Sequence, residues 1–288
     1  MPAASMPMLS KRWARKNCSS IFFLAVTSVL IVTLGLPGLI IGGPVYFLAV
    51  AIFLGIAAWE YVDMAHSSGC RASRPLVVGG VVAIIATRAF FSAQSIVIFT
   101  FSILLAMGLH LVEYERGRDN ATFDFFASVG GLAYMGWVGA YLIDLRTMPD
   151  GLWWSMLVLP VVWLGDTGAY LMGSRYGTHK MTPRLSPKKT WEGFWAGAIT
   201  GALMGGFFAF AYSQWGPLHL PVWEGALFGF MIGILTPLGD LGESMFKRQA
   251  GMKDSGNFFP GHGGVFDRID SWLWAAVLGY YFIVWFAR

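Results

Sequence analysis

The stretch from Gly193 to Gln214 reads GFWAGAITGALMGGFFAFAYSQ and contains no Asp, Glu, Lys or Arg. A helix needs about 20 mostly apolar residues to cross the hydrocarbon core of a bilayer, and this stretch has that length. Similar runs recur along the whole chain, which is 56% hydrophobic and only 12% charged. Because backbone hydrogen bonds must be satisfied within the bilayer, such runs predict membrane helices.

Outward from this stretch the chain contains further apolar runs on both sides. We predict an all-α, polytopic integral membrane protein with about nine transmembrane helices. The whole chain, 1–288, is expected to form a single membrane domain, with helices in 1–160 and helices plus polar loops in 161–288. The predicted spans are residues 20–37, 39–62, 75–91, 94–113, 122–143, 151–173, 193–214, 222–243 and 271–287.

The distribution of positive charge predicts the orientation. With the N-terminus in the cytoplasm, all but three of the 20 Lys and Arg residues fall on the inner side. The exceptions are Arg88, Arg146 and Arg288. Because inner loops of membrane proteins are enriched in Lys and Arg, we predict a cytoplasmic N-terminus and cytoplasmic polar loops at 174–192 and 244–270. Cations scattered between apolar runs favour a bilayer and an anionic substrate as partners, and no nucleic acid.

The first polar constellation begins at Asp166, inside or at the end of an apolar run. A carboxylate there is costly to bury and is a functional candidate, although it could also be a water-exposed acid at a helix end. The loop that follows interleaves cations with hydroxyls and glycines, which suits phosphate oxygens. Contact with anionic headgroups is the alternative. Its candidate residues are Lys180, Ser186, Lys188, Lys189 and Thr190, the last three directly before a predicted helix whose N–H groups add anion donors.

The second constellation begins at Asp240. If this segment is helical, Asp240, Ser244 and Lys247 share one face and could bind a metal ion with its phosphate ligand. The alternative is a simple surface ion pair, such as that of Glu243 with Lys247.

The segment KDSGNFFPGHGGVFDRIDS, residues 253–271, follows before the last span. Asp267 and Asp270 stand at the start of that span, where Asp270 could do no more than favour the helix dipole. The glycines around His262 permit either a tight turn or close approach of a ligand. Carboxylates without a Cys or His cluster indicate Mg²⁺ rather than zinc. The pattern alone predicts a membrane enzyme that handles a phosphorylated substrate at its cytoplasmic face. A cation-coupled transporter that uses Asp166 and Asp240 is the rival class.

One long run with fixed spacing closely resembles the signature of phosphatidate cytidylyltransferases, also called CDP-diacylglycerol synthases. The run is Ser244-x-x-Lys247-Arg248-x₄-Lys253-Asp254-x-Gly256-x₂-Phe259-Pro260-Gly261-His262-Gly263-Gly264-x-x-Asp267-Arg268-x-Asp270. Asp166-Thr167-Gly168-Ala169-Tyr170 and Ser186-Pro187-Lys188-Lys189-Thr190-x-Glu192-Gly193 resemble the same family, and Trp59-Glu60 is similar too. Ser174 and His179 depart from the expected pattern. The likeness of motifs covers about residues 165–271.

The resemblance implies that CTP and phosphatidic acid give CDP-diacylglycerol and pyrophosphate, a reaction of phospholipid biosynthesis, at the cytoplasmic face of the cell (inner) membrane. It implies Mg²⁺ held by Asp240 and Asp267, allows a second cation such as K⁺, and makes a homodimer plausible. An isoprenoid ether lipid phosphate is the alternative lipid substrate. The resemblance makes Asp240, Asp267, Ser244 and Lys247 the catalytic residues. It implies a role in substrate binding for Asp166 and the first-loop candidates, and also for Arg248, Lys253, Asp254, His262, Gly263, Gly264 and Arg268.

Overall fold

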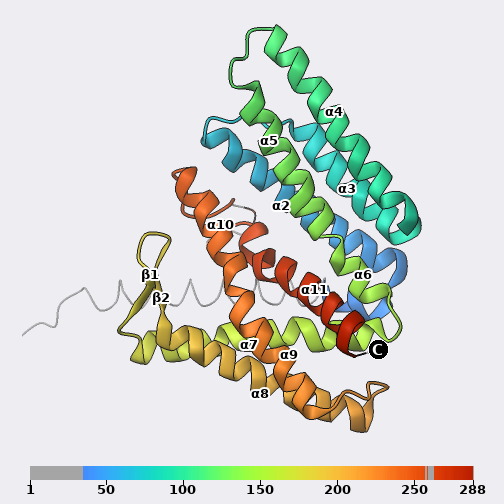
Figure 1. Ribbon diagram of the computed structural model, residues 1–288, viewed down its shortest axis with the longest axis vertical. Coiled ribbons are helices and arrows are strands. Elements are labelled where there is room, and N and C mark those ends of the chain that lie inside the picture. Colours follow the sequence, from blue (N-terminus) through green and yellow to red (C-terminus); the bar gives the residue numbers. More distant parts are fainter. Residues whose placement is uncertain (1–34, 257, 259–262, 288) are drawn as a thin grey trace, which may run out of the picture.

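The protein is described by a computed structural model that covers residues 35–256, 258 and 263–287 (Figure 1). Most of these residues lie in helices. The first group is α2 (Gly43–Ser67), α3 (Arg74–Phe90), the short 3₁₀ helix η1 (Ser92–Gln94), α4 (Ser95–Glu115), α5 (Ala121–Gly131), the π-helix η2 (Leu132–Val138) and α6 (Tyr141–Thr147). The second is α7 (Gly151–Tyr176), strands β1 (Lys180–Thr182) and β2 (Ser186–Thr190), α8 (Trp191–Trp215), α9 (Val222–Leu235), α10 (Pro237–Gln249) and α11 (Phe266–Phe286).

Seven helical segments of the described chain are long and apolar enough to cross a membrane. They are Gly43–Ser67, Ser92–Glu115, Ala121–Thr147, Gly151–Tyr176, Trp191–Trp215, Val222–Gln249 and Phe266–Phe286. The predicted third span corresponds to α3, which has only 17 residues. The first, 20–37, lies almost entirely outside the described residues. The membrane-embedded, helical character is therefore confirmed, whereas the count of nine stays a prediction.

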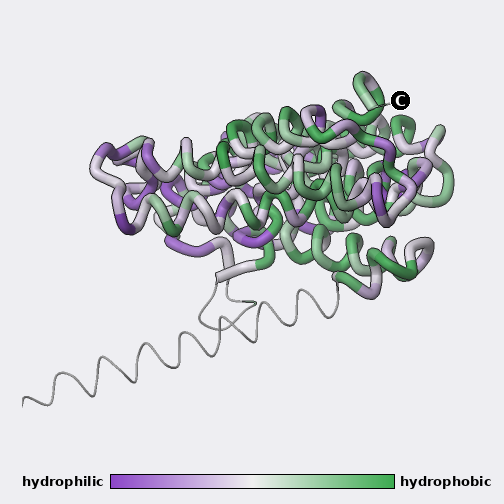
Figure 2. The backbone as a smooth tube through the Cα atoms, turned by 90° about the horizontal axis from the view of Figure 1, so that it is seen from below, coloured by the Kyte–Doolittle hydropathy of each residue, from purple (hydrophilic) through white to green (hydrophobic). Residues whose placement is uncertain are grey.

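Successive helices run back and forth between two edges of the molecule. In Figure 1 the connections after α2 and α10 lie toward the upper left, the connection after α4 lies at the top and the hairpin after α7 lies at the left, whereas the connections after α3, α6 and α8 lie toward the right, the side of the C-terminus. The short helix α3 is needed for this alternation, because it returns the chain from one edge to the other. Which of these edges faces the cytoplasm, as inferred from the positive charges, stays a prediction. In Figure 2 the hydrophilic residues gather toward the end opposite the C-terminus.

The predicted span 222–243 is divided between two helices. Helix α9 ends at Leu235 and α10 begins at Pro237. Proline has no N–H to donate and its ring clashes inside a helix, so it starts a new helix more readily than it continues one. The Ile232 carbonyl accepts both the Thr236 N–H at 3.0 Å and the Thr236 hydroxyl at 2.9 Å, which closes the last turn of α9. This break gives α10, which carries Asp240, a direction of its own.

Small residues of the opening stretch allow α8 to pack closely on its neighbours. A Cβ on Gly229 of α9 would overlap the backbone carbonyl of Gly201 of α8. Close backbone approach of this kind favours helix association in a bilayer, where apolar side chains gain nothing by leaving lipid. Helices α7, α8 and α9 thus form one tightly packed layer.

Helix α11 lies between this layer and the first group of helices. It contacts α2 and α6 on one side and α7 and α9 on the other. Phe266 and Leu273 belong to the core shared with α2 and α3, whereas Ala275 and Phe282 belong to the core shared with α7 and α9. The central position of α11 places its first turn, with Asp267 and Asp270, near polar residues from both halves.

Strands β1 and β2 form a small antiparallel hairpin between α7 and α8. Its register pairs Lys180 with Thr190 and Thr182 with Ser186. The sequence did not predict these strands, since the segment is polar and its strands are short. The hairpin holds Lys188 and Lys189 directly before α8, as the sequence indicated, and Thr190 caps that helix by accepting the Gly193 N–H at 3.3 Å.

Candidate active site

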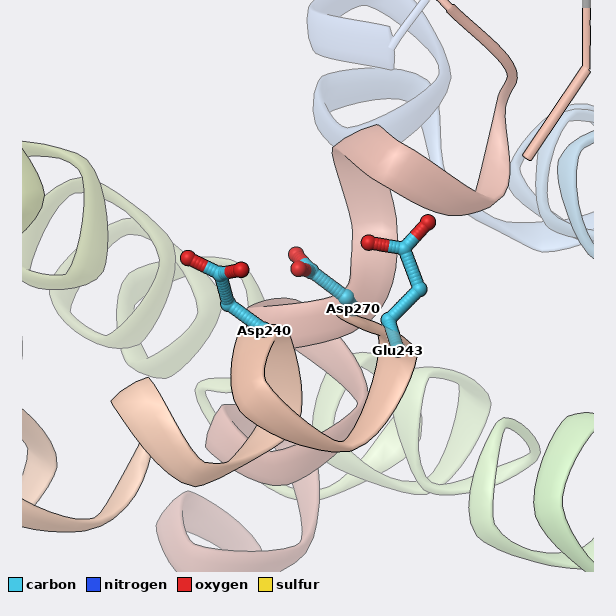
Figure 3. A group of neighbouring side chains, drawn as sticks. All are labelled: Asp240, Glu243 and Asp270. Atoms are coloured by element: carbon cyan, nitrogen blue, oxygen red, sulfur yellow. The ribbon is translucent and has the colours of Figure 1, made fainter. Parts of the chain in front are cut away.

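Three carboxylates from two helices face one another (Figure 3). Asp240 and Glu243 come from α10 and Asp270 from α11, and one oxygen of each lies within 4.8 Å of the others. Glu243 and Asp270 are buried. The buried Oε1 of Glu243 has no hydrogen-bond partner among the described residues. Buried carboxylates need a compensating charge, and a group of three carboxylates in which one buried oxygen has no partner fits a divalent cation with oxygen ligands.

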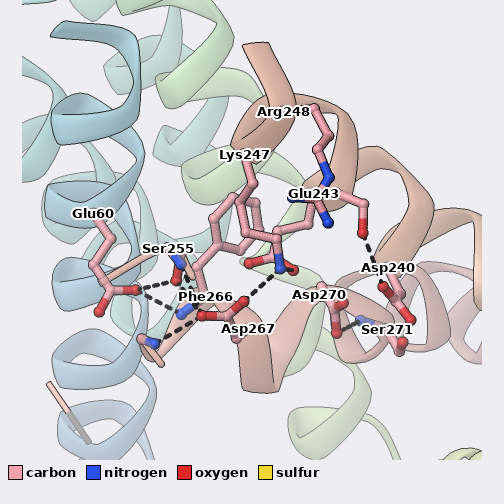
Figure 4. Close-up of polar contacts among 12 residues, drawn as sticks. Glu60, Asp240, Glu243, Lys247, Arg248, Ser255, Phe266, Asp267, Asp270 and Ser271 are labelled. Carbon is pink, nitrogen blue, oxygen red and sulfur yellow. Dashed lines mark hydrogen bonds and ion pairs between the residues drawn. The ribbon is translucent and has the colours of Figure 1, made fainter. Parts of the chain in front are cut away.

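Lys247 joins this acid cluster to Asp267 (Figure 4). Its ammonium group donates to Glu243 Oε2 at 2.8 Å and to Asp267 Oδ1 at 2.5 Å. Both the Lys247 and the Asp267 side chains are 11% exposed. The contact of Glu243 with Lys247 is therefore the predicted i,i+4 ion pair, but it is buried rather than on a helix surface. Charge-assisted hydrogen bonds in such surroundings are stronger than those between neutral groups.

The other oxygen of Asp267 is held by the loop before α11. Oδ2 accepts from the Ser255 N–H at 2.9 Å, the Ser255 hydroxyl at 2.9 Å and the Gly264 N–H at 2.8 Å. Gly263 has a φ of +82°, and a Cβ there would lie 2.5 Å from Oδ2. Gly263 and Gly264 therefore let the backbone approach the Asp267 carboxylate closely. Asp267 is held by four donors and is not part of the cluster of Asp240, Glu243 and Asp270.

Asp240 is also reached by the hairpin. Lys189 Nζ lies 2.8 Å from Asp240 Oδ2 and 3.4 Å from the Pro237 carbonyl oxygen. The Ser244 hydroxyl donates to Asp240 Oδ1 at 3.4 Å, which agrees with the predicted shared face of α10. One carboxylate thus links the acid cluster to the basic loop.

Two adjoining cavities open beside these residues. The larger, of about 690 Å³, is lined by residues of α7, the hairpin, α8, α9 and α10, among them Asp166, Lys180, Ser186, Lys188, Lys189, Thr190 and Asp240. The smaller, of about 250 Å³, is lined by Asp166, Asp240, Glu243, Lys247, Asp254, Asp267, Arg268, Asp270 and Ser271. Because both include Asp166 and Asp240, the basic loop and the acid cluster face connected space.

Some predicted residues lie beside the cavities rather than in their lining. Arg248 is exposed and its Nε donates to the Leu185 carbonyl at 3.3 Å, so it ties α10 to the hairpin. Lys253 is exposed on the loop after α10. Ser244, Gly263 and Gly264 contact Asp240 or Asp267 instead. His262 falls outside the described residues.

Sequence reasoning missed part of the site. Glu243 was considered only as half of an ion pair, and Asp270 only as a helix start and as the last residue of the signature, although both belong to the acid cluster. Ser255 and Glu60 were not candidates. Glu60 lies on α2 and accepts hydrogen bonds from the start of α11. These partners are about 200 positions away in the sequence, so no local pattern predicts the contact. Its one signal was the likeness of the Trp59-Glu60 pair to the family.

The comparison with known proteins agrees with this geometry. The sequence profile of the cytidylyltransferase family matches residues 24–286. The chain belongs to this family of cytidylyltransferases, a class into which a cation-coupled transporter does not fit.

The relatives give a more particular description. A phosphatidate cytidylyltransferase of Synechocystis is 33% identical over an alignment of 296 positions, gaps included, that covers 90% of this chain and 95% of the relative. A protein of the same name from Staphylococcus epidermidis is 31% identical over 259 residues, or 88% of this chain and 95% of the relative. The one from Staphylococcus haemolyticus is 33% identical with the same coverage.

Proposed function

We propose that the protein transfers the cytidylyl group of CTP to phosphatidate, giving CDP-diacylglycerol and pyrophosphate. The relatives of this name support it, since they align over nearly the whole of both chains. The observation that carries the proposal is the position of Asp240. This residue belongs to an acid cluster that suits a metal ion, and it also lines the cavity that contains the lysines. A metal ion and cationic side chains together stabilise the negative charge that develops during transfer of a phosphate-linked group.

The lysines of the larger cavity are proposed to bind phosphate oxygens. Lys180 and Lys188 are exposed and line the cavity, while Lys189 stands between it and Asp240. The N-terminus of α8 begins directly after Thr190 and adds the partial positive charge of a helix start. The cavity volume of about 690 Å³ is in the range of small-molecule sites and suits a nucleotide.

A divalent cation, Mg²⁺, fits the acid cluster. Asp240, Glu243 and Asp270 would hold it, with the unpaired Glu243 Oε1 as one ligand atom. Asp267 as a further ligand remains a proposal, because its Oδ1 would first have to release Lys247. A second cation such as K⁺ is proposed on the family likeness alone. When bound, Mg²⁺ supplies positive charge that offsets the charge of the phosphates and of the leaving pyrophosphate.

The chain's own residues orient the reactants. An oxygen of the lipid phosphate forms a bond to the α-phosphorus of CTP, the bond from that phosphorus to the bridging oxygen of the pyrophosphate breaks, and pyrophosphate leaves. No protein nucleophile is required. Because both reactants are anionic, Lys188, Lys189 and Lys247 lower the repulsion between them as they approach.

The proposed location is the cytoplasmic side of the cell membrane. The positive charges support this, since the hairpin and the loop after α10 are rich in Lys and Arg and lie toward the same edge. CTP would enter from the cytoplasm and the lipid from the inner leaflet. A homodimer is proposed on family likeness alone, and the mass of the detergent-solubilised protein tests it.

Pyrophosphate release from CTP tests the proposed function. Purified protein is supplied with phosphatidate or an isoprenoid ether lipid phosphate in mixed micelles, with and without Mg²⁺. We expect release with phosphatidate and Mg²⁺ and none after chelation. Release with the ether lipid alone would identify the other substrate, and no release with either lipid would overturn the proposal.

A further inference from the structure

Glu60 of α2 is a buried carboxylate that accepts hydrogen bonds from the start of another helix. Its side chain is 5% exposed. Oε1 accepts the Val265 N–H at 3.0 Å and Oε2 accepts the Phe266 N–H at 2.8 Å. Val265 occupies the N-cap position of α11, and its own side chain cannot accept a bond. Glu60 therefore does from a distant helix what an N-cap side chain normally does locally, and its charge suits the positive helix end.

The same carboxylate is connected to Asp267. The Ser255 hydroxyl lies 3.0 Å from Glu60 Oε2 and 2.9 Å from Asp267 Oδ2 (Figure 4). Asp267 follows Phe266 directly in the chain, and Asp270 lies one turn further along α11. The position of Glu60 thus sets both the backbone that carries these two acids and the serine that holds one of them.

The neighbouring glycines fit the shape of this carboxylate. A Cβ on Gly256 would meet three atoms of Glu60 as its nearest neighbours, with Oε1 at 2.5 Å. A Cβ on Gly264 would overlap Glu60 Oε2 as well as the Ser255 hydroxyl. Shifting the carboxylate would relieve either contact only by breaking its bonds to α11. The loop is therefore built closely around Glu60.

We infer that Glu60 is a positioning residue for cytidylyl transfer, which fixes the first turn of α11 so that Asp267 meets Lys247 and Asp270 completes the acid cluster. This inference rests on the proposed function. A purely structural cap would affect how much protein folds, but the folded fraction would keep its turnover and metal affinity. A positioning residue changes both of these quantities in the folded enzyme.

The test compares Glu60→Gln with Gly256→Ala, which displaces the carboxylate without altering it. The matched control is Asp63→Asn, which removes a carboxylate from the same helix where it pairs with Arg74 instead of α11. Turnover is normalised to monodisperse protein, and binding of Mn²⁺ alone is followed by electron paramagnetic resonance. We expect both variants to lower kcat and weaken Mn²⁺ binding by about 10-fold or more, with KM for CTP unchanged when Mg²⁺ is saturating. The control should stay within about twofold of the parent, the ordinary scatter for a surface change.

A double variant tests the fit itself. In a Glu60→Ala background the space beside Gly256 is free, so Gly256→Ala should cause no further loss of kcat. Unchanged kcat and Mn²⁺ affinity in Glu60→Gln would overturn the inference, as would equal losses in the Asp63→Asn control. If the parent protein released no pyrophosphate, the proposed function would fall, and Mn²⁺ binding would still decide the role of Glu60.

Discussion

Asp267→Asn is the substitution that most sharply separates the two roles open to this carboxylate. Asn keeps the size of the side chain and one acceptor oxygen. That oxygen can serve the three donors that now bond Oδ2, from Ser255 and Gly264. The amide NH₂ then points at Lys247 Nζ, so that two donors face each other where a 2.5 Å charge-assisted bond was.

The cost follows from that single lost contact. Removing one partner of a buried ion pair costs about 3–5 kcal/mol, and a hydrogen bond to a charged group contributes about 1.5–3 kcal/mol. Lys247 keeps Glu243 at 2.8 Å, so the lower range applies and we expect about 2–3 kcal/mol. If this loss falls on the transition state, kcat/KM decreases about 30- to 150-fold.

Pyrophosphate release from CTP and phosphatidate measures this effect, with Lys247→Met as the matched variant. If Asp267 acts only through Lys247, the double variant should lose no more activity than Lys247→Met alone, because the lysine that Asp267 orients is already gone. If Asp267 also ligates Mg²⁺, Asp267→Asn abolishes release while Lys247→Met retains a measurable rate. Near-parental turnover in Asp267→Asn, in protein that still elutes as a single species, would refute both roles.

Three further predictions concern the cavity, the cluster and the helix packing. Lys188→Ala should raise the apparent KM for CTP or the lipid about 10-fold, as expected for loss of a charged contact, and unchanged steady-state kinetics would leave Lys188 with a topological role only. Asp240→Asn should weaken Mn²⁺ binding measured by electron paramagnetic resonance by at least about 10-fold, and an unaltered titration would remove Asp240 from the metal site. Gly229→Ala should lower the thermal inactivation temperature, because its Cβ overlaps the Gly201 carbonyl. The control Gly55→Ala, whose Cβ meets only Val82 at 3.7 Å, should leave that temperature unchanged or raise it. Equal effects of the two substitutions would contradict the packing argument.

Hydropathy was enough to predict most of the membrane fold. Long continuous apolar runs become helices in a bilayer, so the predicted spans from 39 onward agree with the helices to within six residues at each end. The break at Pro237 was hidden because the apolar run continues through it, and only local backbone chemistry divides it. The hairpin was missed because β pairing depends on partners rather than on a residue's own preference.

The site was predictable in its parts but not in its pairings. Fixed spacing along one segment placed Asp240, Ser244 and Lys247 on one face, and the structure agrees. Which acids meet across helices depends on how α10 and α11 cross, so the cluster with Asp270 could not be derived from spacing. Glu60 reaches its partners only through the packing of α2 against α11, an arrangement that no local pattern encodes.

The ion pair between Lys189 and Asp240 has a consequence for the order in which ligands bind. At 2.8 Å the lysine occupies one oxygen, Oδ2, of a carboxylate that a cation in the acid cluster would also use. A triphosphate that draws Lys189 toward the larger cavity releases that oxygen, and a cation that takes the oxygen releases the lysine. Each ligand therefore increases the affinity for the other by the same factor. We expect nucleotide and metal to bind with positive cooperativity, so that the affinity for each is low until the other is bound.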